Sequence, residues 1–283
     1  MLICVFFKRP IQTIIICIMS IIISLLNHKG GVGKTTSAIN ISAALVKLGK
    51  KALLVDLDPQ ANLTISLGIP RQKVTIYENM RGEAEIQPFT VKEGMDVVTS
   101  SLDLSGAEME LINEAGREYI LRELFEPLKE DYDYIIIDCP PSLGLLTLNA
   151  LTTSHYVVIP MQTEFLALQG LAKIKQITDK VRFRLNKALQ IGGVIATMYD
   201  NRKVLNRDIV STIEKYFGDK VFNTKIRENV ALAEAPAQHK DIFAYAPHSN
   251  GADDYLKLAK EIVARLEPTR LPDPVAGGKD DDE

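Results

Sequence analysis

The sequence predicts an α/β fold in which helices cover both faces of a mostly parallel, doubly wound sheet. Two observations predict it. Short apolar runs alternate along the chain with segments of helical periodicity, and a glycine-rich turn joins one such run directly to a helix. At 283 residues the chain is near the upper size for a single hydrophobic core. Its net charge of −3 gives the chain as a whole no strong electrostatic preference for a partner.

The glycine-rich turn follows a predicted strand at residues 21–26 and opens a predicted helix at residues 35–48. Glycines let successive backbone N–H groups point into a concave cradle for phosphate oxygens, and the helix N-terminus adds partial positive charge. Lys34 would reach the β- and γ-phosphates, and the Thr35 hydroxyl would bind Mg²⁺. The sequence therefore predicts a P-loop NTPase with these nucleotide-binding residues: Lys29, Gly30, Gly31, Val32, Gly33, Lys34, Thr35 and Thr36.

The loop departs from the common pattern G-x-x-x-x-G-K-[ST] at its first position, where His28 replaces glycine and a second lysine, Lys29, follows. In this respect it resembles the deviant Walker A motif of the ParA/MinD family of ATPases. The resemblance implies a homodimer that encloses ATP between its subunits. It also implies that Lys29 reaches the partner's phosphates and acts in catalysis together with Lys34.

Two carboxylates end the second predicted strand, at residues 51–57. Asp56 and Asp58 are two residues apart, so they point to the same side of the strand and face the nucleotide. The segment resembles the family's second signature, which implies that Asp56 belongs to the Mg²⁺ shell and that catalytic Asp58 orients the attacking water. From the residues alone, the alternative is a pair of carboxylates that caps a following helix.

A third apolar run, at residues 134–137, delivers Asp138 toward the metal's water shell, which is the Walker B arrangement. Pro140 and Pro141 would then fix the backbone of a switch segment that responds to the γ-phosphate. The residues expected at the metal are Thr35, Asp56 and Asp138, the two carboxylates through water.

The rest of the chain continues the alternation of strands and helices. Strands are predicted at residues 96–99, 156–160 and 191–198, and helices at 118–128, 167–183, 204–217 and 252–266. By the family resemblance, the adenine pocket closes around Asp200, Asn201 and the stretch 227–236, which ends in Pro236.

Basic residues gather in one part of the chain, because residues 171–227 hold thirteen Lys/Arg against five Asp/Glu, a local +8. The chain looks most like the partition group of the family, the ParA/Soj type. That likeness implies an ATP-bound dimer on non-specific double-stranded DNA and a ParB-like protein that stimulates slow hydrolysis, driving chromosome or plasmid partition. Candidate phosphate contacts are Arg202, Lys203, Arg207, Lys225 and Arg227. Ala231, where the family often has a basic residue, keeps open a MinD-like positioning ATPase whose cargo is a protein complex.

The chain ends are expected to lie outside an ATPase domain at residues 19–267. We expect translation to start at Met19, with residues 1–18 as an upstream extension, and a short hydrophobic tether is the alternative. Residues 268–283 are acidic and proline-broken, typical of disorder and unlike a membrane-binding helix. Cys139 is the only cysteine after residue 20, which argues against a shared iron–sulfur cluster. No stable membrane insertion is expected, and the expected location is cytoplasmic and nucleoid-associated.

Overall fold

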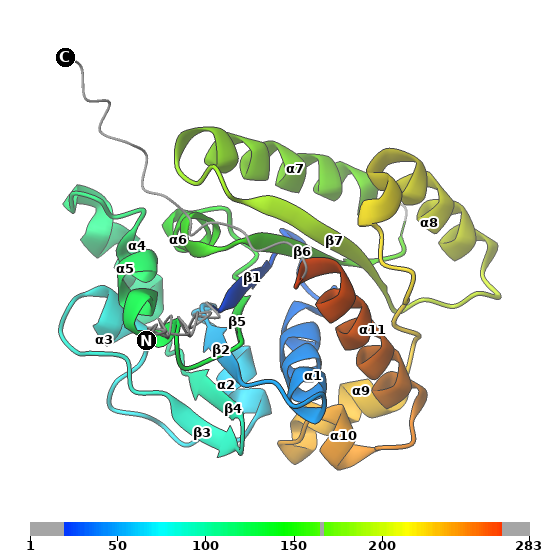
Figure 1. Cartoon of the computed structure of the whole chain (residues 1–283), viewed down its shortest axis with the longest axis horizontal. Helices are drawn as coiled ribbons and strands as arrows, with labels where there is room; N and C mark the ends of the chain where they lie inside the picture. The colour runs from blue at the N-terminus through cyan, green and yellow to red at the C-terminus, as the bar shows by residue number, and fades with distance from the viewer. Residues whose placement is uncertain (1–19, 165–166, 268–283) are drawn as a thin grey trace, which may run out of the picture.

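The computed structural model describes residues 20–164 and 167–267, so the predictions for residues 1–18 and 268–283 lie outside it. Seven strands form one sheet, in the order β3-β4-β2-β5-β1-β6-β7 (Figure 1). The strands are β1 Ile21–Leu25, β2 Ala52–Asp56, β3 Phe89–Lys92, β4 Met95–Val98, β5 Tyr134–Asp138, β6 Tyr156–Gln162 and β7 Gln190–Thr197. All neighbouring pairs are parallel except β3 with β4, which confirms the predicted mostly parallel, doubly wound sheet.

Helices follow most strands and pack on both faces of the sheet (Figure 1). The α-helices are α1 Lys34–Lys47, α2 Asn62–Ser66, α3 Ile76–Met80, α4 Leu104–Glu110, α5 Ile120–Phe125, α6 Leu145–Thr153, α7 Ala167–Arg184, α8 Val204–Phe217, α9 Val230–Glu234, α10 Ile242–Tyr245 and α11 Asn250–Leu266. None of the helices in the described ranges is long and apolar enough to cross a bilayer.

Two hydrophobic clusters, one on each face, explain why the central strands are almost entirely apolar; within β1 the exception is the buried Ser24, whose hydroxyl is hydrogen-bonded to that of Ser154. Along β5, Ile135 and Ile137 pack into the cluster that includes α5, α6 and α7, whereas Ile136 packs into the cluster that includes α1 and α11. Successive side chains of a strand point to opposite faces, so a strand covered on both sides is apolar at most positions. The carboxylates Asp56 and Asp138 stand at the carboxyl ends of β2 and β5, where the site lies.

The parallel register brings the carboxyl ends of three strands together. Asp56 of β2 pairs with Asp138 of β5, and Asp138 also pairs with Leu25 of β1, which leads into the glycine-rich turn. The order of the sheet therefore places the two predicted carboxylates beside the predicted phosphate loop.

The structure corrects one predicted helix and adds elements that the sequence analysis did not identify. The helix predicted at 118–128 is α5 followed by a separate 3-10 turn at Glu126–Leu128, because Pro127 lacks the N–H that a continuing α-helix needs. Edge strand β3 and helix α4 lie in the stretch that the sequence pattern left unassigned. The Cys139 thiol is fully buried, and burial raises its pKa to about 12.

Candidate nucleotide-binding site

The predicted phosphate loop joins β1 to α1 as expected. Gly31 and Gly33 have φ angles of 74° and 86°, and these left-handed values favour glycine. Nothing lies within 4 Å of where a Cβ would stand on Gly30 or Gly31, so the loop is uncovered at these two positions. The helix begins at Lys34 without a side-chain cap, which leaves the first N–H groups of α1 free to bind an anion.

The two lysines of the loop occupy different environments. Lys34 is 8% exposed, and its ammonium lies 3.5 Å from the Lys29 carbonyl oxygen, so it is folded back over the loop. The Lys29 side chain is about half exposed and forms an ion pair with Glu164 at 2.5 Å. Lys34 is therefore placed to meet phosphates of its own subunit, whereas Lys29 is held at the surface.

Asp138 and Thr35 form the best-defined polar pair of the site. The Thr35 hydroxyl donates a hydrogen bond to Asp138 Oδ2 at 2.6 Å, and the other oxygen, Oδ1, is buried without a hydrogen-bond partner. Burial, with a smaller contribution from the charge of Asp56, raises the pKa of Asp138 to about 8. A buried carboxylate oxygen without a partner is costly, and a cation or its water shell would supply the missing interaction.

Both carboxylate oxygens of Asp56 accept hydrogen bonds, unlike those of its neighbour in the sheet, Asp138. Its Oδ2 accepts hydrogen bonds from the Thr64 amide at 2.9 Å and hydroxyl at 2.7 Å, and its Oδ1 accepts one from the Asp58 amide at 3.3 Å. Burial raises its pKa to about 6 despite these donors. In this structure Asp56 therefore holds the loop that follows β2, and Asp138 has the freer oxygen for a metal.

Asp58 lies on that loop rather than at a helix cap. Its Oδ1 accepts from the Gln60 amide at 3.0 Å, whereas α2 begins four residues later with Ala61 as its N-cap. The capping alternative raised by the sequence does not describe Asp58, whereas Asp56 does accept a hydrogen bond from the Thr64 amide in the first turn of α2. One carboxylate oxygen of Asp58 has no hydrogen bond among the described residues, and the side chain is only partly buried.

Pro140 and Pro141 follow Asp138 directly and lead through an irregular segment to α6. Pro140 is buried and Pro141 is exposed. The Thr147 hydroxyl donates to the Ser142 carbonyl at 2.6 Å, and Glu108 accepts a hydrogen bond from the Leu146 amide at 3.2 Å. The predicted switch segment is therefore tied at its far end to α6 and, through Glu108, to α4.

A cavity of about 400 Å³ opens beside the loop and suits the base of a nucleotide. It is lined by Gly33 and Thr36 of the loop, by Tyr255 of α11, and by residues after β7, including Met198, Arg227, Asn229 and Val230. The Thr197 hydroxyl donates to the Val32 carbonyl at 2.8 Å, which ties the end of β7 to the loop. The sequence analysis predicted the loop residues and the stretch 227–236 but missed Thr197, Met198 and Tyr255, which lie far from the loop along the chain: 165 positions separate Thr197 from Val32.

Six residues of the predicted stretch 227–236 line this cavity, whereas Asp200, Asn201 and Pro236 do not. Asp200 is engaged by Arg202, whose guanidinium lowers the pKa of Asp200 to about 2. Asn201 and Pro236 lie in neighbouring segments and likewise do not line the cavity. Their role in nucleotide binding remains a prediction.

All five predicted DNA contacts already have partners within the chain. Arg202 pairs with Asp200, Lys203 with Glu228, Lys225 with Glu214, and Arg227 with Asp253 and Asp254, while Arg207 donates to the Asn201 carbonyl. Three other cations, on one side of α7, form no ion pair among the described residues: Lys173, Lys180 and Arg184.

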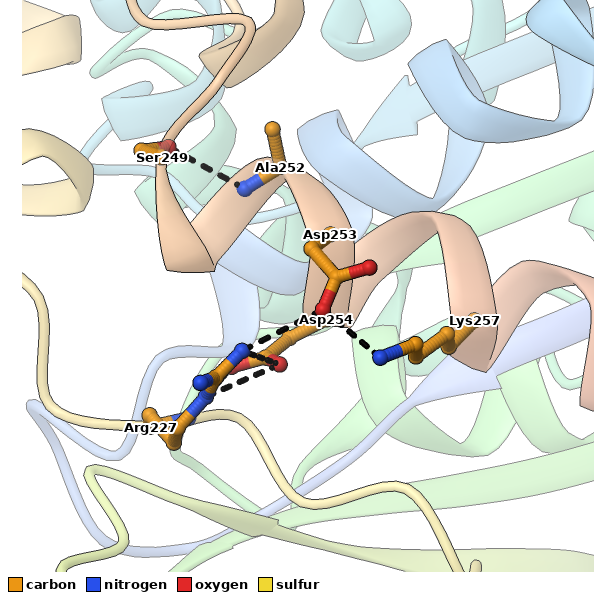
Figure 2. Close-up of polar contacts among 6 residues, drawn as sticks. All are labelled: Arg227, Ser249, Ala252, Asp253, Asp254 and Lys257. Atoms are coloured by element: carbon orange, nitrogen blue, oxygen red, sulfur yellow. Dashed lines mark hydrogen bonds and ion pairs between the residues drawn. The ribbon is translucent and has the colours of Figure 1, made fainter.

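Arg227 is the most firmly held of the five (Figure 2). Its amide and guanidinium both donate to the buried Asp254 near the start of α11, the shortest bond being 2.6 Å. Asp253 contacts Arg227 and also accepts from Lys257 at 2.7 Å. Because Arg227 also lines the cavity, this ion-pair cluster fixes one wall of it rather than presenting a free cation.

Comparisons with known proteins agree with this geometry. A family model described as an AAA domain matches residues 20–191. The chain is 49% identical to the chromosome-partitioning ATPase Soj of Treponema pallidum over 242 residues, which covers 84% of this chain and 95% of that protein. It is 47% identical to the sporulation initiation inhibitor protein Soj of Bacillus subtilis, covering 87% and 99% of the two chains.

A solved structure from Mycobacterium smegmatis, described as cobyrinic acid a,c-diamide synthase with bound ADP and magnesium, superposes with a TM-score of 0.78. It is 35% identical, and the match covers 90% of this chain and 99% of that one.

Proposed function

This chain belongs to the family of Soj/ParA-type partitioning ATPases, and from that premise we propose that it is an ATP-dependent dimerisation switch that binds DNA. In this proposal, ATP with Mg²⁺ closes two subunits face to face, the dimer binds double-stranded DNA without sequence preference, and a ParB-like partner stimulates slow hydrolysis. Hydrolysis would release the dimer and drive chromosome or plasmid partition.

The observation that carries the nucleotide chemistry is the buried Asp138 Oδ1, which has no hydrogen-bond partner and lies next to the Thr35 hydroxyl. Mg²⁺ in phosphoryl-transfer sites usually takes one or two protein oxygens together with phosphate oxygens and water. Thr35 and Asp138 match that donor set, and the phosphate loop is uncovered at Gly30 and Gly31. When bound, Mg²⁺ would neutralise charge that develops on the phosphates.

Each polar residue of the site has a separate task in the proposed reaction. Lys34 would bind the β- and γ-phosphates from above the loop, and the helix N-terminus would orient them. Asp58 would accept a hydrogen bond from the attacking water and hold it in line with the γ-phosphate. Asp56, whose oxygens are occupied by Thr64 and Asp58, would act by holding that loop.

Lys29 supports the dimer part of the proposal. Its ammonium lies at the surface with Glu164 rather than over its own loop, so it is available to a facing subunit once that exposed ion pair opens. Exposed ion pairs contribute only about 0–1 kcal/mol, so phosphates of a partner could replace Glu164 at small cost. In the dimer, Lys29 would stabilise the charge of the transition state on the other subunit's nucleotide.

DNA binding is supported by charge rather than by a specific contact. Because the five residues predicted from the sequence are paired within the chain, we add Lys173, Lys180 and Arg184 of α7 as candidate phosphate contacts. If four cations per subunit contact phosphates, affinity falls with salt with a slope of about −3.6 per subunit in a log–log plot. Dimerisation doubles the number of contacts, so ATP would raise affinity without touching DNA.

The test is binding of the purified chain to a non-specific duplex with ATP or with ADP, across a salt series. We expect the chain to bind the duplex with ATP and not with ADP. This binding should weaken steeply as the salt concentration rises, and it should also weaken when Lys180 and Arg184 are changed to alanine. Lys73→Ala, at an exposed lysine outside the basic region, is the matched control. Equal, negligible binding with both nucleotides would overturn the DNA part and favour a protein cargo, as in a MinD-like positioning ATPase.

A further inference from the structure

The loop that carries Asp58 is held by a residue outside the nucleotide-binding signatures. Ser100, just after β4, donates its hydroxyl to the Asp58 main-chain carbonyl at 2.8 Å. Its amide donates to the Thr64 hydroxyl at 3.1 Å, and that hydroxyl donates in turn to Asp56. Ser100 and Thr64 are only 6% and 8% exposed, so these bonds are largely shielded from water.

These bonds fix Asp58 at both of its peptide groups. On one side, the Asp58 amide donates to Asp56 Oδ1 at 3.3 Å. On the other side, its carbonyl accepts from Ser100 and from the Ala61 amide at 2.9 Å. When both peptide planes of a residue are fixed, its φ and ψ are fixed, and so is the direction of its Cα–Cβ bond.

The anchor itself rests on rigid parts of the fold. Val98, two residues before Ser100, pairs with Val55 inside the parallel sheet. The Thr99 carbonyl accepts from the Ile76 amide at 2.9 Å, which ties the same turn to α3. Ser100 therefore links the Asp58 loop to the carboxyl end of β4, so the sheet determines where that loop lies.

We propose that Ser100 is a positioning residue for ATP hydrolysis, because it sets the direction of the Asp58 side chain through the main chain. This inference rests on the water-orienting role proposed above for Asp58. A general base or water-orienting group works only within hydrogen-bond reach of its target, and small displacements lower the rate steeply. In the described part of the chain, the hydroxyl and the amide of Ser100 donate to the Asp58 loop and to Thr64 rather than to the phosphate loop or Asp138, so Ser100 should influence turnover without influencing nucleotide binding.

The experiment measures ATP turnover and ATP affinity of the full chain for Ser100→Ala, Asp58→Ala and Ser105→Ala. Ser105 is exposed on α4 five residues away, so its substitution is the same chemical change without the bonds. We expect Ser100→Ala to lower kcat roughly 3- to 10-fold with KM and ATP affinity within about twofold, from the loss of one shielded hydrogen bond. Ser105→Ala should behave as the unchanged chain.

Hydrogen exchange separates positioning from general destabilisation. In Ser100→Ala, amides of residues 57–63 should exchange faster, while amides of β1 and β5 keep their protection. Thr64→Val removes the hydroxyl that accepts from the Ser100 amide and donates to Asp56, so it weakens the same network of hydrogen bonds around the Asp58 loop. The double variant should therefore lose less activity than the product of the two single losses.

The outcomes distinguish this inference from the proposal on which it rests. If Asp58→Ala is inactive and Ser100→Ala keeps the kcat of the unchanged chain, the role of Ser100 is wrong and that of Asp58 stands. If Asp58→Ala turns over normally, the water-orienting role of Asp58 is wrong and Ser100 loses its target. If Ser100→Ala does not fold, unchanged turnover in a folded Ser100→Gly chain, which also lacks the hydroxyl, would overturn the inference.

Discussion

Asp138 is an unfavourable residue for the stability of the empty chain. Its carboxylate is buried, one oxygen has no hydrogen-bond partner, and Asp56 pairs with it across the sheet. Burying a polar group without a partner costs free energy, and a nearby carboxylate adds repulsion when both are charged. The site is therefore organised before its ligand arrives, at the expense of unfolding free energy.

Asp138→Asn should raise the stability of the metal-free chain at neutral pH, because the pKa of Asp138 is raised to about 8 and folding must either protonate this carboxyl or bury its charge, a cost that an amide of the same shape does not carry. We expect the free energy of unfolding to increase by about 1–2 kcal/mol, measured by urea denaturation in EDTA. The same variant should lose Mg²⁺-dependent ATP hydrolysis. A variant that is less stable than the unchanged chain in EDTA would contradict this account of Asp138.

Lys34→Ala should abolish ATP binding, because it removes the ammonium that lies over the phosphate loop. Calorimetric titration should show no heat of binding, and ATP with Mg²⁺ should no longer raise the melting temperature. Lys73→Ala keeps the same charge change away from the site and should bind normally. Submicromolar ATP affinity in a folded Lys34→Ala chain would contradict the assignment of the loop.

At the level of elements, the sequence predicts the strands, helices and turns whose pattern lies within a short stretch of the chain. The sequence predicts the strands that end in Asp56 and Asp138, the glycine-rich turn and the helix Val204–Phe217. Each is defined by a hydrophobic period, by glycines or by a carboxylate within a short stretch of the chain. The wall of the base cavity was predicted only in part: the family resemblance points to residues 227–236, whereas Thr197, Met198 and Tyr255 come to the phosphate loop only in the folded chain. Strand β3 is half-exposed and pairs antiparallel at the edge, so its pattern is weak.

Gly193→Ala tests how tightly β7 packs on the segment after α8. A Cβ at Gly193 would clash with the Phe222 ring and lie 2.9 Å from the Lys220 carbonyl oxygen. The backbone oxygen cannot move aside as a flexible side chain could, so we expect a loss of about 2 kcal/mol or more, measured by urea unfolding. Gly82→Ala, at a glycine in open space with φ of 72°, should show backbone strain alone and a smaller loss.

At the scale of the whole molecule, the proposed switch depends on a second subunit. The net charge of −3 is small, so neither assembly nor DNA binding is driven by overall charge. Among the described residues, six of the thirteen basic residues between β6 and α9 form ion pairs with carboxylates, which reduces the field that a single subunit presents.

Asp58→Ala should accumulate as an ATP-bound dimer, because ATP still binds while hydrolysis stops. Size-exclusion chromatography with light scattering should give a dimer mass with ATP and Mg²⁺ and a monomer mass with ADP. Adding Lys29→Ala should return the ATP form toward the monomer. A monomer mass under all conditions would contradict a dimer that encloses ATP between its subunits.

The pairing of Asp56 with Asp138 and of Asp138 with Leu25 has a consequence for how this chain tolerates insertions. Side chains alternate between the two faces with a period of two, so one extra residue inside β5 would turn Ile135 and Ile137 toward the opposite helices and move Asp138 out of line. An extra residue in the exposed turn near Glu114 would change no pairing. Lengthening should therefore be tolerated between the strands but abolish function within them.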